Sequence, residues 1–206
     1  AEIDGNEWVI HLQKGEKIKS KILINASGPW INETLKKNIK IKSKNKIRLV
    51  KGSHIITKKL YKKDVAFTFQ NTDKRIIFVI PYKKKFSLIG TTEVEVKSPE
   101  NKEISKKEIQ YLIRSVNNYL EKQISTKDIV DSYSGIRPLI EDFNQASKVT
   151  RDYIFDLNII KKLPLLSIYG GKLTTYRKLA ENVLLDLEKF LPKTKMGPWT
   201  HKKNLF

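Results

Sequence analysis

The chain has 206 residues, no cysteine and a formal net charge of +19. Its length is enough to bury a core, and the lack of cysteine excludes disulfides and thiolate metal sites. Its three histidines are too scattered to predict a metal cluster, and neither a signal peptide nor an apolar run of about 18 residues is present. The charge suggests a phosphate-bearing partner, but only six of the 41 basic residues are Arg, so lysines that only solvate the surface are the preferred main cause of the charge.

The first predicted elements are two strands, at residues 7–12 and 18–24, with Gly15 in the turn between them. This spacing predicts a β-hairpin. The second strand runs into residues 25–30 (NASGPW) and then into a polar helical stretch at 31–38. A strand-to-helix turn made of small residues exposes backbone N–H groups and lets a ligand approach closely.

The middle of the chain is rich in β-structure. Its strands are predicted at residues 47–57, 64–70, 75–81 and 86–92, and the apolar run at 76–80 is expected to be buried on both faces. Ser105 and Glu108 have the spacing of a capping box, which starts a helix.

The remaining predicted elements are strands at 128–135, 148–156 and 165–169, followed by a final helix at about 173–190 with Leu179, Val183, Leu184 and Leu187 on one face. Long strand runs with few helices favour an α+β fold over a repeated βαβ arrangement.

Two segments in this β-rich region carry candidate binding residues. Residues 51–54 (KGSH) place a glycine in a strand, which often marks the close approach of a ligand or backbone, next to His54, a candidate acid or base. A structural histidine is the alternative. Residues 133–139 (YSGIRPL) put Arg137 between glycine and proline, where the strand is expected to end, which suits an anion site as well as a surface ion pair.

Two later segments add further candidates. Residues 150–153 (TRDY) contain Arg151, which alone is a weak indication because it could simply pair with a neighbour. Residues 170–177 (GGKLTTYR) join a strand, two glycines and a helix start, an arrangement whose free N–H groups and helix dipole suit an anion or the edge of a ring. A plain helix start is the alternative, and the spacing of a Walker A loop is absent.

Taken together in chain order, these segments resemble the respiratory, FAD-dependent glycerol-3-phosphate dehydrogenases. The resemblance covers residues 18 to about 200 and rests on NASGPW, KGSH, FVIP (78–81), GTT (90–92), YSGIRPL, TRDY and GGKLTTYRKLA (170–180). YSGIRPL and GGKLTTYRKLA are highly specific, whereas NASGPW is shared more widely among flavoenzymes of this fold. The family usually has Asp after Gly-Thr-Thr, and here Glu93 takes that place.

The resemblance implies oxidation of sn-glycerol 3-phosphate to dihydroxyacetone phosphate, with hydride transfer to FAD and electrons passed to a membrane quinone. It implies a peripheral protein on the cytoplasmic side of the inner membrane, and a homodimer is one expected assembly.

The resemblance also implies the site residues. Ser27 and Gly28 are expected near the FAD adenosine and pyrophosphate. The isoalloxazine is expected to be lined by Gly170, Gly171, Lys172, Leu173 and Thr174, and the substrate by His54, Arg137, Arg151 and Lys172, with catalytic roles for His54, Arg137 and Lys172.

The expected domains are residues 1–45, part of a Rossmann-like FAD-binding domain; 46–160, a substrate domain with a mixed, largely antiparallel sheet; and 161–206, a return to the FAD-binding domain. No G-x-G-x-x-G motif occurs, and the chain starts at Ala1. Because that motif holds the pyrophosphate in this fold, FAD binding is expected to need an N-terminal segment encoded elsewhere.

Two other classes of function stay open at this stage. An inactive fragment is one, and a basic module that binds anionic membrane or nucleic acid is the other. Nucleic acid is not the expected partner, because no helix-turn-helix, RNP-type aromatic pattern or zinc signature accompanies the charge.

Overall fold

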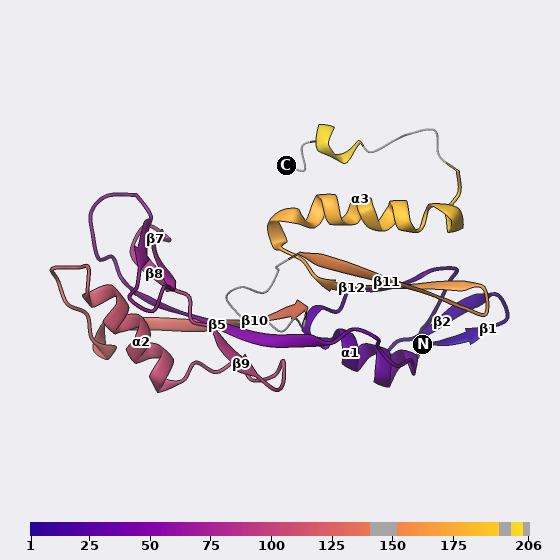
Figure 1. Ribbon diagram of the computed structural model, residues 1–206, viewed down its shortest axis with the longest axis horizontal. Helices are drawn as coiled ribbons and strands as arrows, with labels where there is room; N and C mark the ends of the chain where they lie inside the picture. The colour runs from indigo at the N-terminus through magenta and orange to yellow at the C-terminus, as the bar shows by residue number, and fades with distance from the viewer. Residues whose placement is uncertain (141–151, 194–198, 204–206) are drawn as a thin grey trace. The chain divides into compact units, whose positions relative to one another are not determined.

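The computed structural model describes residues 1–140, 152–193 and 199–203. The chain forms two compact units: a terminal unit, made of Ala1–Ile47 with Pro138–Phe206, and a central unit, Arg48–Arg137. It passes between them inside two strands, β5 (Ile47–Lys58) and β10 (Ile129–Ile140), both labelled in Figure 1. Helices and sheets in both units, with antiparallel strand pairs in each and a parallel pair in the terminal unit, confirm the predicted α+β class.

An antiparallel three-stranded sheet opens the terminal unit, in the order β1 (Glu2–Asp4), β2 (Glu7–His11) and β3 (Lys17–Ser20). The pairing of β2 with β3 confirms the predicted hairpin. The predicted strand at 18–24 is wrong as a single element, because it divides into β3 and β4 (Leu23–Asn25). The Ser20 hydroxyl bonds both the N–H and the C=O of Ile22, which turns the chain there and sends β4 into another sheet.

A second sheet of the terminal unit has the order β11 (Tyr153–Ile160), β12 (Leu163–Gly170) and β4. The pair β12 and β4 is parallel, with Ser167 opposite Asn25, whereas β11 and β12 form an antiparallel hairpin. The hydrophobic core of this unit contains Trp8, Ile31, Leu35, Leu165 and Tyr169. Residues of β12 therefore pack against residues of the N-terminal segment of the unit.

The helical parts of the terminal unit are short. They are η1 (Gly28–Trp30), α1 (Ile31–Glu33) and the π-helix η2 (Thr34–Ile39), then η4 (Leu173–Thr175), α3 (Tyr176–Asp186), η5 (Glu188–Phe190) and η6 (Thr200–Lys202). The predicted helix at 173–190 is therefore three consecutive pieces. Val183 and Leu187 pack on Leu166, but Leu184 is 56% exposed, because it lies about 100° around the helix from Val183.

The central unit is built on one antiparallel sheet in the order β10, β5, β8 (Phe86–Gly90), β7 (Ile76–Tyr82) and β6 (Phe67–Gln70), with β9 (Val94–Val96) also paired to β5. Helix α2 (Lys106–Asn117) lies against this sheet, and the short η3 (Thr126–Asp128) precedes β10. Leu112 and Val116 of α2 pack on Ile55, Ile77 and Ile89 of the strands. The predicted capping box of Ser105 and Glu108 is confirmed at the start of α2.

Strand β7 corrects one prediction. Its apolar run was expected to be buried on both faces, but only Ile77 and Val79 are buried, whereas Ile76, Phe78 and Ile80 are 49%, 43% and 38% exposed. The reason is that α2 covers only the face of the sheet that carries Ile77 and Val79. We call that side of the sheet the helix face and the other side the His54 face.

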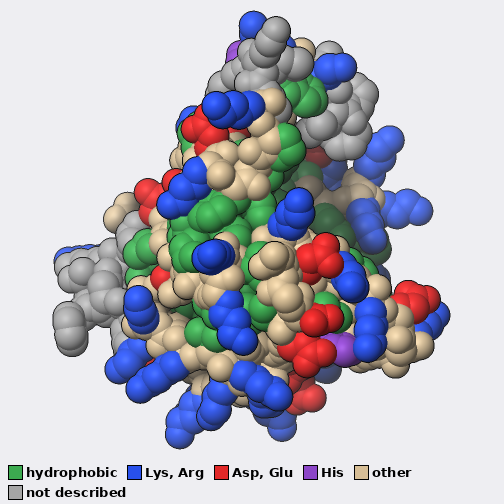
Figure 2. Space-filling view, turned by 90° about the vertical axis from the view of Figure 1, so that its right-hand side faces the viewer, with side chains coloured by type: hydrophobic (Ala, Val, Ile, Leu, Met, Phe, Trp, Pro, Cys, Tyr) green, Lys and Arg blue, Asp and Glu red, His purple; other side chains and the backbone are tan. Residues whose placement is uncertain are grey.

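The basic residues spread over the surface. In Figure 2, the blue Lys and Arg side chains lie over much of the face shown, with red Asp and Glu side chains among them. Within the described residues, no helix has the length and apolar character needed to cross a bilayer.

Candidate functional site in two parts

His54 lies in a row of residues that three adjacent strands of the central unit place side by side. Phe78 on β7 is opposite Gly90 on β8, and Gly90 is opposite His54 on β5. Residues directly opposite one another share a face of the sheet, and alternate residues of a strand point to opposite faces. His54 and Gly52 therefore face away from α2, whereas Lys51, Ser53 and Ile55 face toward it.

Two glycines provide the space for the candidate functional side chains. A Cβ atom on Gly90 would lie 2.0 Å from Cδ2 of His54, and one on Gly52 would lie 2.4 Å from Nη2 of Arg137. Such distances are far inside van der Waals contact. The sequence analysis predicted a close approach at the glycine of KGSH, and the structure identifies the approaching group as the guanidinium of Arg137.

Arg137 projects from β10, which pairs with β5. The strand was expected to end near Arg137, but β10 continues to Ile140. Pro138 is tolerated inside it because β10 is the edge strand of this sheet. Nη2 of Arg137 donates a hydrogen bond of 3.3 Å to the Thr91 hydroxyl. Thr91 belongs to the GTT motif, but the sequence analysis gave it no role.

The surroundings of His54 favour its neutral form. Its ring stacks on Tyr133 with the centroids 4.9 Å apart, and its Nδ1 is buried without a hydrogen-bond partner among the described residues. Burial, and then the positive charge of Arg137, hold the pKa of His54 below its ordinary value. At neutral pH the imidazole therefore keeps a lone pair that can accept a proton.

The terminal unit contains the second part of the site, at the carboxyl ends of its parallel strands. From the pairing of Ser167 with Asn25, β12 and β4 run in the same direction past one edge, toward Gly170 and Gly28 respectively. Ligands of open α/β sheets bind at such edges. The predicted residues Ser27, Gly28, Gly170 and Gly171 thus come together there.

Backbone conformation explains the glycines at this edge. Gly28, Gly170 and Gly171 have φ angles of 57°, 75° and 96°, in the region that disfavours a side chain. The buried Asn25 fixes the first turn, because its Oδ1 accepts a 2.7 Å bond from the Ser27 hydroxyl and its Nδ2 donates to the C=O of Ile31. Asn25 belongs to the NASGPW motif, but the motif alone does not indicate this role.

The second turn differs in one respect from the expectation. The N–H of Gly171, expected to face the flavin, donates to the C=O of Asp152 at 3.2 Å. Lys172 and Thr174 are exposed, and Leu173 is 87% exposed. The predicted residue Arg151 lies outside the described residues. His54 and Arg137 belong to the central unit, and Lys172 belongs to the terminal unit.

The family model for FAD dependent oxidoreductases matches residues 1–177. The chain belongs to this family. The resemblance predicted from its motifs is confirmed by glycerol-3-phosphate dehydrogenases of Pseudomonas aeruginosa and Escherichia coli, each 43% identical over 96% of this chain. A D-erythritol 1-phosphate dehydrogenase of Brucella abortus is 38% identical over 94% of it. The chain spans about two fifths of the length of these relatives, 40%, 41% and 40% respectively.

Solved structures support the same family. The glycerol-3-phosphate dehydrogenase of Bacillus halodurans, complexed with FAD, matches 85% of this chain and 33% of its own with a TM-score of 0.68 and 28% identity. A glycine oxidase of Geobacillus kaustophilus matches 93% of this chain and 47% of its own with a TM-score of 0.63, but at 17% identity it shows the fold alone.

Proposed function

We propose that this chain supplies the substrate-binding face and part of the flavin-binding edge of an enzyme that oxidises sn-glycerol 3-phosphate to dihydroxyacetone phosphate. One observation carries the proposal: His54, whose pKa is lowered by burial and by Arg137, lies near that arginine on one sheet face, and each side chain fits over a glycine. The names of the Pseudomonas and Escherichia relatives support this substrate.

FAD fits the residues of the terminal unit. Gly28 leaves open space within 4 Å of where its Cβ would be, so a ligand can approach its backbone closely. The exposed ammonium of Lys172 suits negative charge on a flavin ring or a substrate phosphate. When bound, FAD would accept the hydride from C2 of the substrate.

The chain's own residues perform the proton and binding steps. His54 accepts the proton of the C2 hydroxyl as the hydride leaves that carbon, so a carbonyl forms. Arg137 binds the phosphate group, and Thr91 orients its guanidinium. The phosphate is only a few bonds from the hydroxyl, so the base and the phosphate ligand must lie close together, as His54 and Arg137 do. Arg151 and Lys172 are proposed as further substrate ligands.

We also propose that the electrons pass on to a membrane quinone, and that the protein works as a peripheral protein on the cytoplasmic side of the inner membrane. This part of the proposal rests on the resemblance to the respiratory dehydrogenases. Reduction of a soluble quinone analogue, dependent on glycerol 3-phosphate, would support it.

The test uses the protein as it is produced in its own cell, purified with its flavin. Anaerobic addition of sn-glycerol 3-phosphate is expected to bleach the flavin absorption and to yield dihydroxyacetone phosphate. D-erythritol 1-phosphate is the comparison substrate, because one relative is named as a dehydrogenase of that compound. Faster bleaching by the four-carbon compound would assign that compound, and not glycerol 3-phosphate, as the substrate. If neither polyol phosphate bleaches the flavin, the proposed reaction is refuted.

A further inference from the structure

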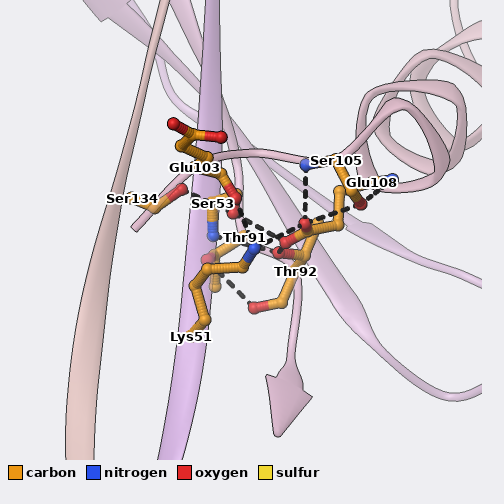
Figure 3. Close-up of polar contacts among 8 residues, drawn as sticks. All are labelled: Lys51, Ser53, Thr91, Thr92, Glu103, Ser105, Glu108 and Ser134. Atoms are coloured by element: carbon orange, nitrogen blue, oxygen red, sulfur yellow. Dashed lines mark hydrogen bonds and ion pairs between the residues drawn. The ribbon is translucent and has the colours of Figure 1, made fainter. Parts of the chain in front are cut away.

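A buried ion pair lies on the helix face, directly behind His54 and Arg137. Nζ of Lys51 on β5 is 3.0 Å from Oε2 of Glu108 on α2, and each side chain is only 5% exposed. Figure 3 shows the two side chains meeting between the strand and the start of the helix, among hydroxyl groups from several segments.

The hydrogen bonds around this pair are extensive. Nζ of Lys51 also donates to the C=O of Glu103 at 2.5 Å. One oxygen of Glu108 accepts from the hydroxyls of Ser53 and Thr92 at 2.7 and 2.9 Å. The other accepts from the N–H and the hydroxyl of Ser105 at 2.9 and 2.8 Å. A buried polar network of this kind rigidifies and specifies one arrangement.

The network reaches β10 through a side-chain bond. The Ser134 hydroxyl donates to the Ser53 hydroxyl at 2.7 Å. Ser53 is the residue between Gly52 and His54, and Ser134 is the neighbour of Tyr133. The same two strands therefore present the network on the helix face and the candidate substrate residues on the His54 face.

Stability alone is a poor reason for burying such a pair. Well-packed apolar side chains of similar volume often stabilise a protein at least as much as a buried ion pair does. The best-attested use of buried polar groups is to fix the register of the segments that they join. A strand can keep the same residues on each face if it slides by two positions. Such a slide of β10 would move the backbone of Arg137 by roughly 7 Å, so its guanidinium would no longer lie over Gly52.

We propose that Lys51, Ser53, Glu108 and Ser134 are positioning residues: they fix the register of β10 on β5 and so place Arg137 over Gly52, beside His54. The consequence for catalysis rests on the function proposed above. The register itself does not, because it determines the distance between two side chains whether or not substrate binds.

The first test is the double variant Lys51→Met/Glu108→Leu, made in the protein as its cell produces it. It removes both buried charges together, so the net charge is unchanged and no buried charge is left unpaired. We expect a cooperative thermal transition near that of the wild type. The KM for glycerol 3-phosphate is expected to rise about tenfold or more, with a smaller change in kcat per bound flavin, because the phosphate ligand is displaced more than the base.

A second readout needs no activity. The charged and titratable groups that face His54 in the described structure are Arg137 and Tyr133. If Arg137 moves away, the pKa of His54, followed by NMR, rises toward its ordinary value. A wild-type protein that leaves glycerol 3-phosphate unreacted would refute the proposed function, and this titration would still test the register.

The matched control is Glu33→Leu/Lys37→Met, which removes an exposed ion pair from the terminal unit and should leave both KM and the His54 titration unchanged. If the buried double variant does not fold, Ser134→Ala keeps the ion pair and removes only the bond between the strands. It should raise KM in the same direction, by about threefold. Wild-type KM and a wild-type His54 titration in either folded variant would overturn the proposal.

Discussion

The two parts of the candidate site use glycine for opposite purposes. On the His54 face, Gly52 and Gly90 have no positive φ angle and serve by lacking a side chain, so that a guanidinium and an imidazole can occupy the space. At the edge of the terminal unit, Gly28 and Gly170 adopt positive φ angles, which shape the backbone itself. The first part acts through side chains and the second through backbone turns, so substitutions should affect chemistry in one and backbone conformation in the other.

The largest expected effect is on the side-chain part. Replacement of His54 by Gln should lower kcat/KM by about a thousandfold, because general-base catalysis typically contributes 10²–10⁴. Because the pKa of His54 lies below 6.5, wild-type activity should be retained at neutral pH and fall as the pH drops through that pKa. The variant should lack this acidic decline. A pH profile of kcat/KM measures both, and an unchanged profile would rule out the base role.

The next effect concerns stability of the central unit in acid. Burial raises the pKa of Glu108, but hydrogen bonds from Ser105, Ser53 and Lys51 outweigh this and hold the pKa at about 2. Since the folded pKa is below that of the unfolded chain, this stabilisation is complete above about pH 4.5 and is lost as pH falls toward about 2, by about 3 kcal/mol.

Urea unfolding at pH 5 and at pH 2.5 measures this loss. The variant Glu108→Gln should show a weaker dependence on pH than the wild type, whereas Glu33→Gln, at an exposed site, should keep it. Equal slopes in wild type and Glu108→Gln would contradict the assignment.

A third substitution tests the space beside His54. Gly90→Ala puts a methyl group where the imidazole ring lies, so the ring must turn away, and kcat/KM should fall about a hundredfold. Gly135→Ala on β10 is the matched control, because its Cβ would meet nothing within 4 Å. If both alanine variants have equal activity, the close fit at Gly90 has no functional meaning.

The smallest effect belongs to a turn in the terminal unit. Lys161 and Lys162, between β11 and β12, have φ angles of 48° and 72°, which is unfavourable for a residue with a side chain. Lys162→Gly should therefore stabilise the protein by about 1 kcal/mol in chemical denaturation. Lys17→Gly, within β3, should destabilise it by about 0.5–1 kcal/mol, and the opposite order would refute this explanation.

The sequence predicted the helices and strands better than it predicted which face of each is buried. The hairpin, the capping box of α2 and the α+β class follow from local patterns and are confirmed. The exposure of Phe78 does not follow, because an apolar run cannot reveal that a helix covers only one face of its sheet. The break at Ile22 depended on one hydroxyl, that of Ser20, bonding the backbone.

The same limit applies to the site. Motifs indicated His54 and Arg137, but the role of Thr91 as a partner of Arg137 needs the distance between strands that are far apart in sequence. The lysine content is also easier to interpret in the structure. All six described non-glycine residues with positive φ are lysines, at positions that usually favour Gly or Asn: Lys40, Lys74, Lys83, Lys84, Lys161 and Lys162. This favours a general enrichment in lysine over a dedicated phosphate-binding surface.

The fit of His54 over Gly90 and of Arg137 over Gly52 also has an evolutionary consequence. Each glycine and the side chain that lies over it are expected to be conserved or lost together. The reason is that a methyl group at the glycine would displace the functional side chain. Among relatives, Gly90 should therefore be exchanged only in lineages that have also given up the imidazole, and Gly52 only in those that have given up the guanidinium. The two glycines would then record the loss of the reaction as faithfully as the residues that carry it out.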